Sequence, residues 1–255
     1  MRKVAYAGHT VTFPDVPDQE NFFSILERGE WDNELFEFIR ANTDRHTVFI
    51  DVGAWIGVTP FWAAQRVQKV IAVEPDPVCV KLLQEMQGMN PGNVVVQNAA
   101  LATGNSLKVG SVGGFGSSMT SALAANNADA IIASGVSLQS LLDQADGAPI
   151  FLKIDIEGYE YYLCEQLKQI KPNQVRAISL AIHPVEYARS LSSNRRISAV
   201  RETARLIRSF PQYDLLNWRA LLAALGNLVS MKQRRQHDLE FVSNYPTSAP
   251  IGQDK

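Results

Sequence analysis

The sequence predicts an open α/β fold, with a mostly parallel sheet covered by helices on both faces. Short apolar runs recur along the chain, end in acidic or polar residues, and are separated by helical stretches. Glycines after the first main run predict a tight strand-to-helix turn. A chain of 255 residues with 46% hydrophobic content suffices for one such domain with a small extension.

Residues 1–46 are expected to form an N-terminal hairpin and helical cap. Apolar alternation over 4–6 and 10–13, on either side of a glycine, predicts the hairpin. Amphipathic patterns over 21–26 and 34–39 predict two short helices. This cap is expected either to cover one end of a cofactor cleft or to serve packing alone.

The stretch 47–57 predicts the first strand of the main sheet and its turn. Residues 48–50 are apolar and suit a buried parallel strand, which Asp51 ends. Gly53 and Gly57 frame the turn into a helix. A capping aspartate in a plain strand–turn–helix fits this pattern. So does a ligand site, since ligands bind at the carboxyl ends of such strands and Asp51 can accept hydrogen bonds from a cationic group.

The second strand is predicted over 69–74, with a helix over 77–87. Glu74 ends this strand at the interval expected for an acid that grips both ribose hydroxyls of a nucleoside. A carboxylate can accept two hydroxyl protons at once. Pro75 lacks an N–H, so it bends the chain away from the sheet and leaves a flat edge for an adenine.

A third strand over 94–97 runs into Asn98 and Ala99. Asn98 can hydrogen-bond an adenine amino group while Ala99 leaves room for the ring, but a turn-forming asparagine fits equally well. Residues 104–135 are weakly patterned. We expect them to be a functional loop or partly disordered, placed as a flap over the site. Ser137 is a candidate cap for the helix that follows.

Residues 150–154 predict another buried strand, with Asp155 and Glu157 at its tip. In a doubly wound sheet this strand lies beside the first, so Asp155 is expected to face the reactive end of a cofactor. These acids and Glu160 need a positive partner. The candidates are Lys153, a ligand cation and a divalent metal. We do not expect a required metal, because the sequence indicates no clear third or fourth ligand.

The C-terminal part begins with a strand over 177–182 that ends in His183. This histidine is either a general base for a hydroxyl or a satisfied structural residue. The segment 189–235 is basic, which indicates a solvated helix face or a dock for an anionic acceptor. The remaining expected elements are helices over 194–209 and 219–230, strands over 213–218 and 239–242, and a disordered tail over 246–255.

Two nucleoside cofactors compete for the predicted site. A dinucleotide site needs G-x-G-x-x-G around a pyrophosphate, but Trp55 replaces the second glycine and Asp51 repels phosphate. S-adenosylmethionine is cationic, carries a free ribose diol and fits better. A nicotinamide-dependent oxidoreductase is therefore the less favoured enzyme. The alternative that is not an enzyme is a non-catalytic methyltransferase-like binding module.

Composition narrows the possible partners. A net charge of −2 gives the chain no overall electrostatic attraction to nucleic acid or to a membrane surface. No apolar run approaches the ~20 residues of a membrane span, and we expect no signal peptide. Cys79 and Cys164 are expected to be reduced thiols, which predicts a cytoplasmic protein.

Three motifs stand in one order: Phe49-Ile-Asp-Val-Gly-Ala-Trp-Ile-Gly57, Val73-Glu-Pro-Asp76 and Leu152-Lys-Ile-Asp-Ile-Glu-Gly-Tyr-Glu160. Together they resemble the FkbM-type family of class I S-adenosylmethionine-dependent methyltransferases. The resemblance implies a single Rossmann-like methyltransferase domain, here 47–245. Its seven-stranded sheet would have the order 3-2-1-4-5-7-6, with the last strand antiparallel. It also implies methyl transfer to a hydroxyl of a sugar, glycan or related natural product.

The resemblance also implies roles for individual residues. Asp155 faces the reaction centre, with Glu157 and His183 as further catalytic candidates. Trp55 departs from the family, where asparagine is frequent, and Ala181 stands where the family often has glutamate. The expected cofactor contacts are, from the methionine end through the ribose to the adenine, Asp51, Gly53, Ala54, Gly57, Glu74, Pro75, Asn98 and Ala99.

Overall fold

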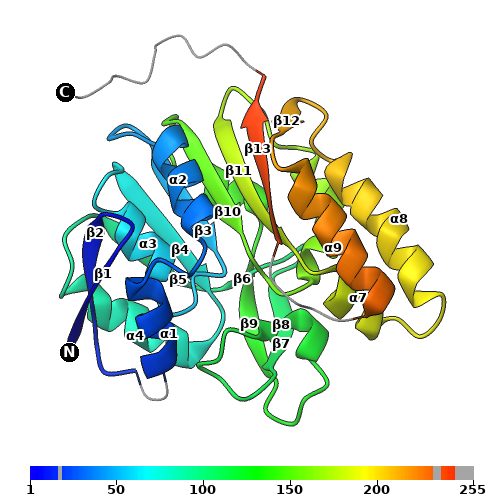
Figure 1. The fold of residues 1–255 in the computed structure, drawn as a ribbon, viewed down its shortest axis with the longest axis horizontal. Coiled ribbons are helices and arrows are strands. Elements are labelled where there is room, and N and C mark those ends of the chain that lie inside the picture. The colour runs from blue at the N-terminus through cyan, green and yellow to red at the C-terminus, as the bar shows by residue number, and fades with distance from the viewer. Residues whose placement is uncertain (17–18, 232–236, 245–255) are drawn as a thin grey trace.

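The computed structural model describes residues 1–16, 19–231 and 237–244. A seven-stranded sheet runs through the molecule, and helices pack on both of its faces (Figure 1). The α/β fold expected from the sequence is confirmed. The strands of this sheet are β3 (Val48–Val52), β4 (Lys69–Glu74), β5 (Val94–Asn98), β10 (Ile150–Ile154), β11 (Val175–Ile182), β12 (Tyr213–Leu215) and β13 (His237–Ser243).

The sheet is mixed, and its strands lie in the order β5-β4-β3-β10-β11-β13-β12. The first five of these run parallel, whereas β13 is antiparallel to both β11 and β12. Numbered along the chain from β3, the order reads 3-2-1-4-5-7-6. The direction of winding changes between β3 and β10. Ligands of open α/β sheets bind at the carboxyl ends of such a strand pair.

One face of the sheet is covered by the N-terminal part of the chain. The expected hairpin and both expected helices are present, and they share one apolar core with the sheet. The rings of Phe49 and Phe151, on neighbouring strands, stack at 5.3 Å between centroids in this core. The elements on this face are β1 (Arg2–Tyr6), β2 (His9–Phe13), α1 (Glu20–Glu27), α2 (Asn33–Asn42), α3 (Val58–Ala63) and α4 (Pro77–Gln87).

The opposite face is covered by the C-terminal helices, which pack on the alternate residues of the same strands. Both faces of β3 and β10 are therefore buried, as their continuous apolar runs predict. Helix α7, which begins at Pro184, was not predicted. The elements here are α5 (Leu138–Asp143), the 3-10 turn η2 (Tyr159–Tyr162), α6 (Cys164–Leu167), α7 (Pro184–Ser190), α8 (Arg195–Ile207) and α9 (Trp218–Ser230).

The prediction of a loose segment over 104–135 was wrong in part, because three stretches of it are strands of a second sheet of order β6-β9-β7-β8. This sheet lies beside the carboxyl ends of the main strands (Figure 1). Its core is small, built on Ala100, Val109 and Ala133. Small residues gave the strands a weak apolar signal. Its elements are β6 (Ala100–Leu101), β7 (Ser106–Ser111), β8 (Thr120–Ser121), η1 (Ala122–Ala124) and β9 (Ile131–Val136).

Two expectations concern the ends of the chain. The tail over 246–255 lies outside the described residues. The division into a cap over 1–46 and a domain from residue 47 stays a prediction.

Among the described residues, every helix is too short or too polar to cross a membrane.

Candidate active site

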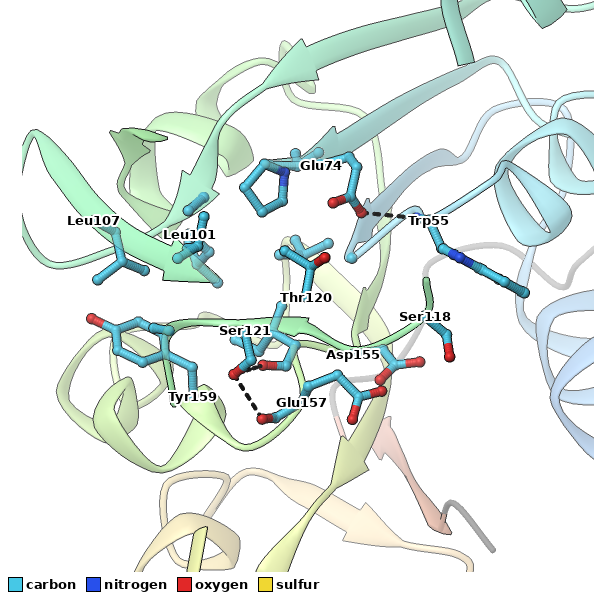
Figure 2. A pocket seen from close by; sticks show the side chains of 18 of the residues that line it. Trp55, Glu74, Leu101, Leu107, Ser118, Thr120, Ser121, Asp155, Glu157 and Tyr159 are labelled. Atoms are coloured by element: carbon cyan, nitrogen blue, oxygen red, sulfur yellow. Dashed lines mark hydrogen bonds between the residues drawn. The ribbon is translucent and has the colours of Figure 1, made fainter. Parts of the chain in front are cut away.

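A cavity of about 210 Å³ opens at the carboxyl ends of β3, β4 and β10 (Figure 2). Its walls come from the main sheet, from Phe22 and Trp31 of the N-terminal cap, and from the second sheet. Asp51, Ala54, Gly57, Asn98 and His183 are not among its lining residues. The predicted site residues that line it are Gly53, Glu74, Pro75, Ala99, Asp155 and Glu157.

Glu74 lies in the wall at the end of β4, and its side chain is almost fully buried. Its Oε2 accepts a hydrogen bond of 2.9 Å from the backbone N–H of Trp55, and its Oε1 accepts one of 2.9 Å from that of Asp76. Each oxygen keeps further acceptor capacity. Burial raises the pKa of Glu74 to about 7, although the two N–H donors favour the charged form.

Gly53 is required by the close approach of two strands. Its φ is +87°, and a Cβ atom there would lie 1.8 Å from the carbonyl oxygen of Asp155. The turn that follows β3 is therefore built directly against the tip of β10. Gly57 also has a left-handed φ, +93°, but a Cβ there would meet Phe61 in the core. The structure places Gly57 in helix packing, away from the cavity lining.

Asp51 is fully buried behind the cavity wall. Its Oδ1 is 3.1 Å from Nζ of Lys153, and its Oδ2 accepts a hydrogen bond from Thr59. The register of β3 and β10 sets this pair, because Lys153 is the partner of Asp51 across the strands. Burial would lower the pKa of Lys153, but Asp51 and other acids raise it well above its ordinary value. Direct contact of Asp51 with a cofactor stays a prediction.

Asn98 is exposed at the end of β5, next to the cavity rim. Its Nδ2 donates hydrogen bonds to the carbonyl oxygens of Glu74, at 3.2 Å, and Pro75, at 3.4 Å. These bonds give the side chain the turn-forming role considered from the sequence. They leave Oδ1 as the atom that can accept a hydrogen bond from an amino group, so the predicted adenine contact stays a prediction.

Trp55 joins three walls of the cavity, a role that the sequence analysis did not assign to it. Its ring packs edge-on against Phe22 of α1, at 4.9 Å between centroids. Its Nε1 donates a hydrogen bond of 3.3 Å to the carbonyl oxygen of Gly116. The N-terminal cap and the segment between β7 and β8 thus meet at this side chain, over the glycine turn.

Asp76 is a second functional position that the sequence analysis missed. Its Oδ1 caps α4 by accepting from Val78 and Cys79, as an aspartate before a proline at the first helical position predicts. Its Oδ2 accepts hydrogen bonds from the N–H of Gly116, at 2.7 Å, and the hydroxyl of Thr120, at 3.0 Å. One buried carboxylate therefore anchors the wall of the cavity that comes from the second sheet.

At the other end of the cavity, Asp155 and Glu157 lie side by side (Figure 2). Nε2 of the buried His183 is 3.7 Å from Oδ1 of Asp155 and 3.6 Å from Oε2 of Glu157. The other oxygen of Asp155 faces Lys153 at 3.7 Å. The structure thus brings together all three predicted catalytic residues, and it adds the lysine that the sequence offered as a partner for the acids.

Glu160 holds His183 in place from behind. Its Oε1 accepts a hydrogen bond of 2.8 Å from the backbone N–H of His183 and is 3.3 Å from Nδ1 of the ring. Burial would lower the pKa of His183, but Glu157, Glu160 and Asp155 raise it well above its ordinary value. Burial and the neighbouring acids raise the pKa of Glu157 to about 7, against the pull of His183.

Comparison of the whole sequence with known protein families shows which family the chain belongs to. A family profile described as "Methyltransferase FkbM domain" matches residues 51–229, more than half of the chain. The chain belongs to the FkbM methyltransferase family. This confirms the family that the three motifs resemble and the activity class, an S-adenosylmethionine-dependent methyltransferase. The matched range holds every predicted site residue, from Asp51 to His183.

Solved structures of methyltransferases share a distant likeness with the chain. The 23S rRNA methyltransferase ErmE is 12% identical, with a TM-score of 0.42, and the match covers 82% of this chain and 66% of that one. A putative S-adenosylmethionine-dependent methyltransferase from Listeria monocytogenes is 8% identical, with a TM-score of 0.43 over 82% and 96%. Methyltransferase FkbM from Methylobacillus flagellatus KT is 12% identical, with a TM-score of 0.42 over 90% and 56%. No curated protein matches the sequence.

Proposed function

We propose that this FkbM methyltransferase transfers the methyl group of S-adenosylmethionine to a hydroxyl of a sugar, a glycan or a related natural product. One observation carries the proposal. The cavity has a carboxylate suited to a ribose diol, Glu74, in its wall at the end of β4, and the carboxylate of Asp155 in its wall at the end of β10. A donor bound between them would present its methyl group near Asp155.

The cofactor would bind along the ends of the strands. Both oxygens of Glu74 already accept backbone N–H bonds, which fix the carboxylate, and each can accept one ribose hydroxyl as well. Pro75, Ala99 and Leu101 supply an apolar wall for adenine. Gly53 lets the backbone pass close to the methionine end.

The methyl transfer itself is an in-line displacement. The hydroxyl oxygen attacks the methyl carbon, the carbon–sulfur bond breaks, and the sulfonium becomes a neutral thioether. The hydroxyl proton must go to a base. Asp155 is the better candidate because its carboxylate lines the cavity, whereas His183 is buried behind it. The protein aligns the two reactants, and the cofactor supplies the reactive group.

Replacing Asp155 by asparagine tests this role. We expect transfer of radiolabelled methyl from S-adenosylmethionine to a pool of hydroxylated glycans to fall by about 10²-fold or more, the usual contribution of a general base. The dissociation constant of the cofactor should change by less than about threefold, because Glu74 is intact. Glu165→Gln, an exposed change on α6, is the matched control and should alter neither quantity. Equal losses of turnover and of cofactor affinity would contradict a catalytic role.

The ion pairs of the basic residues bear on the charge of the acceptor. The basic segment 189–235 suggested either a solvated helix face or a dock for an anionic acceptor. Arg201 and Arg205 pair with Glu202, and Arg189 is 3.5 Å from Glu186, which favours the solvated face for these three arginines. We therefore keep a small-molecule or glycan acceptor without requiring a negative charge.

A cytoplasmic location also stays part of the proposal. Cys79 and Cys164 are both free and buried, which is compatible with a reducing compartment. The nicotinamide alternative is not favoured, since the family is one of methyltransferases.

A further inference from the structure

Three side chains of types that can bind a metal ion face one another at the ends of β10 and β11. The candidate ligand atoms of Asp155, Glu157 and His183 all lie within 4.8 Å of one another. The Nε2 of His183 is 3.7 Å and 3.6 Å from the two carboxylate oxygens, beyond hydrogen-bonding distance. Ligands with bonds of about 2.1 Å lie about 3.0 Å apart when adjacent and about 4.2 Å apart when opposite. The two spacings from Nε2 of His183 fall between these limits.

The orientation of His183 is a second, independent observation. The side chain is only 2% exposed, and Glu160 faces its Nδ1 at 3.3 Å. Because Glu160 faces Nδ1, a cation that displaced the proton on Nε2 would find the lone pair of that nitrogen directed at the two acids. A carboxylate behind a histidine in this way is the usual outer partner of a metal-bound imidazole. The two acids that converge on this ring need a positive charge between them, and a bound cation would supply it in place of the ring proton.

We propose that Asp155, Glu157 and His183 bind one divalent cation of the Mg²⁺ or Mn²⁺ class. Two carboxylate oxygens and one imidazole nitrogen, without a thiolate, suit this class. Both acids line the cavity, so coordination positions remain open on that side. The expectation of no required metal rested on a missing third ligand, and the fold supplies one from the end of β11.

The place of this site suggests its use. A cation there would contact the acceptor hydroxyl and lower the pKa of that hydroxyl, which eases its deprotonation. This use rests on the proposed function, whereas binding of the ion does not. The second oxygen of Asp155 faces Lys153 at 3.7 Å, so this lysine orients the carboxylate while its first oxygen faces His183.

Titration of the metal-stripped protein with Mn²⁺ tests the proposal, with the signal of free Mn²⁺ followed by electron paramagnetic resonance. We expect one saturable site per chain. Glu157→Gln and His183→Gln should each weaken Mn²⁺ binding by about tenfold or more, and Mg²⁺ should compete. Glu165→Gln, which removes a carboxylate from exposed α6, is the matched control and should bind as the native chain does.

Two results would overturn the proposal. One is the absence of saturable Mn²⁺ binding by the native protein, which would leave a proton as the charge that these groups share. The other is native-like binding by both Glu157→Gln and His183→Gln. Titration with S-adenosylmethionine in the presence of EDTA checks that each variant is folded. It also separates the proposals, because cofactor binding without Mn²⁺ binding removes only the metal site.

Discussion

At the scale of single residues, the site depends on carboxylates whose surroundings differ. Asp51 is neutralised by Lys153 inside the core, whereas Glu74 is held by two backbone N–H groups at the cavity wall. The sequence identified both acids, but it assigned both of them to the cofactor. Their different surroundings depend on strand register and on which side chain becomes enclosed, and the local sequence does not contain this information.

Cofactor affinity should depend on pH through Glu74. Only the ionised carboxylate accepts both ribose hydroxyls, and with a pKa of about 7 its ionised fraction falls as the pH is lowered. Between pH 8 and pH 6 this fraction changes by about tenfold, and affinity should fall by a similar factor. Calorimetric titration with methylthioadenosine, which keeps the ribose and adenine but lacks the amino acid, measures this. A flat profile for the native protein would contradict the assignment.

The matched variant for this measurement is Glu74→Gln. It should bind more weakly at pH 8 and lose the pH dependence of affinity, and a Gln variant that kept this dependence would point to another titrating group.

The raised pKa of Glu74 also affects the stability of the folded protein. Because the folded pKa of about 7 exceeds the ordinary 4.5, the free native protein should lose stability as the pH rises between these values. A bound diol should oppose this loss.

At the scale of elements, the turn after β3 is fixed by one glycine. Gly53→Ala should destabilise the protein by about 2–5 kcal/mol, from a strained positive φ and from overlap with the carbonyl of Asp155. Gly226→Ala in α9 is the matched control. With nothing within 4 Å of the added Cβ, it should stabilise the protein by about 0.5–1 kcal/mol. Urea unfolding measures both, and changes of equal sign would contradict this account.

The wall from the second sheet should depend on Asp76. Asp76→Ala should cost about 1 kcal/mol as a lost helix cap, and it should also weaken S-adenosylmethionine binding by about tenfold, since Gly116 and Thr120 lose their acceptor. Ser137→Ala removes the cap of α5, which lies away from the cavity, so it should match the loss of stability without the loss of affinity. Native-like affinity in Asp76→Ala would mean that this wall is not held by Asp76.

The sequence predicted the main elements because their signals are local. The helix over 77–87 follows from its proline and aspartate at the start, and the strand over 150–154 from an unbroken apolar run. The second sheet escaped prediction because β7 and β9 pair across a long, glycine- and serine-rich connection. The role of Glu160 escaped for a similar reason, since its partner His183 is distant in sequence.

At the scale of the whole molecule, one cavity gathers contributions from three parts of the chain. The N-terminal cap brings Phe22 and Trp31, the main sheet brings the acids, and the second sheet closes the remaining wall. Trp31 and Phe22 pack edge-on at 5.7 Å, and Phe22 in turn contacts Trp55. The N-terminal segment therefore lines the candidate site as well as packing in the core.

The central claim is that this cavity binds S-adenosylmethionine, and calorimetric titration of the purified protein tests it most directly. We predict saturable binding of one S-adenosylmethionine per chain, weakened in Glu74→Gln and unchanged in Ser137→Ala, and no binding of NAD under the same conditions. Binding of NAD in place of S-adenosylmethionine, or S-adenosylmethionine binding that Glu74→Gln leaves intact, would contradict the claim.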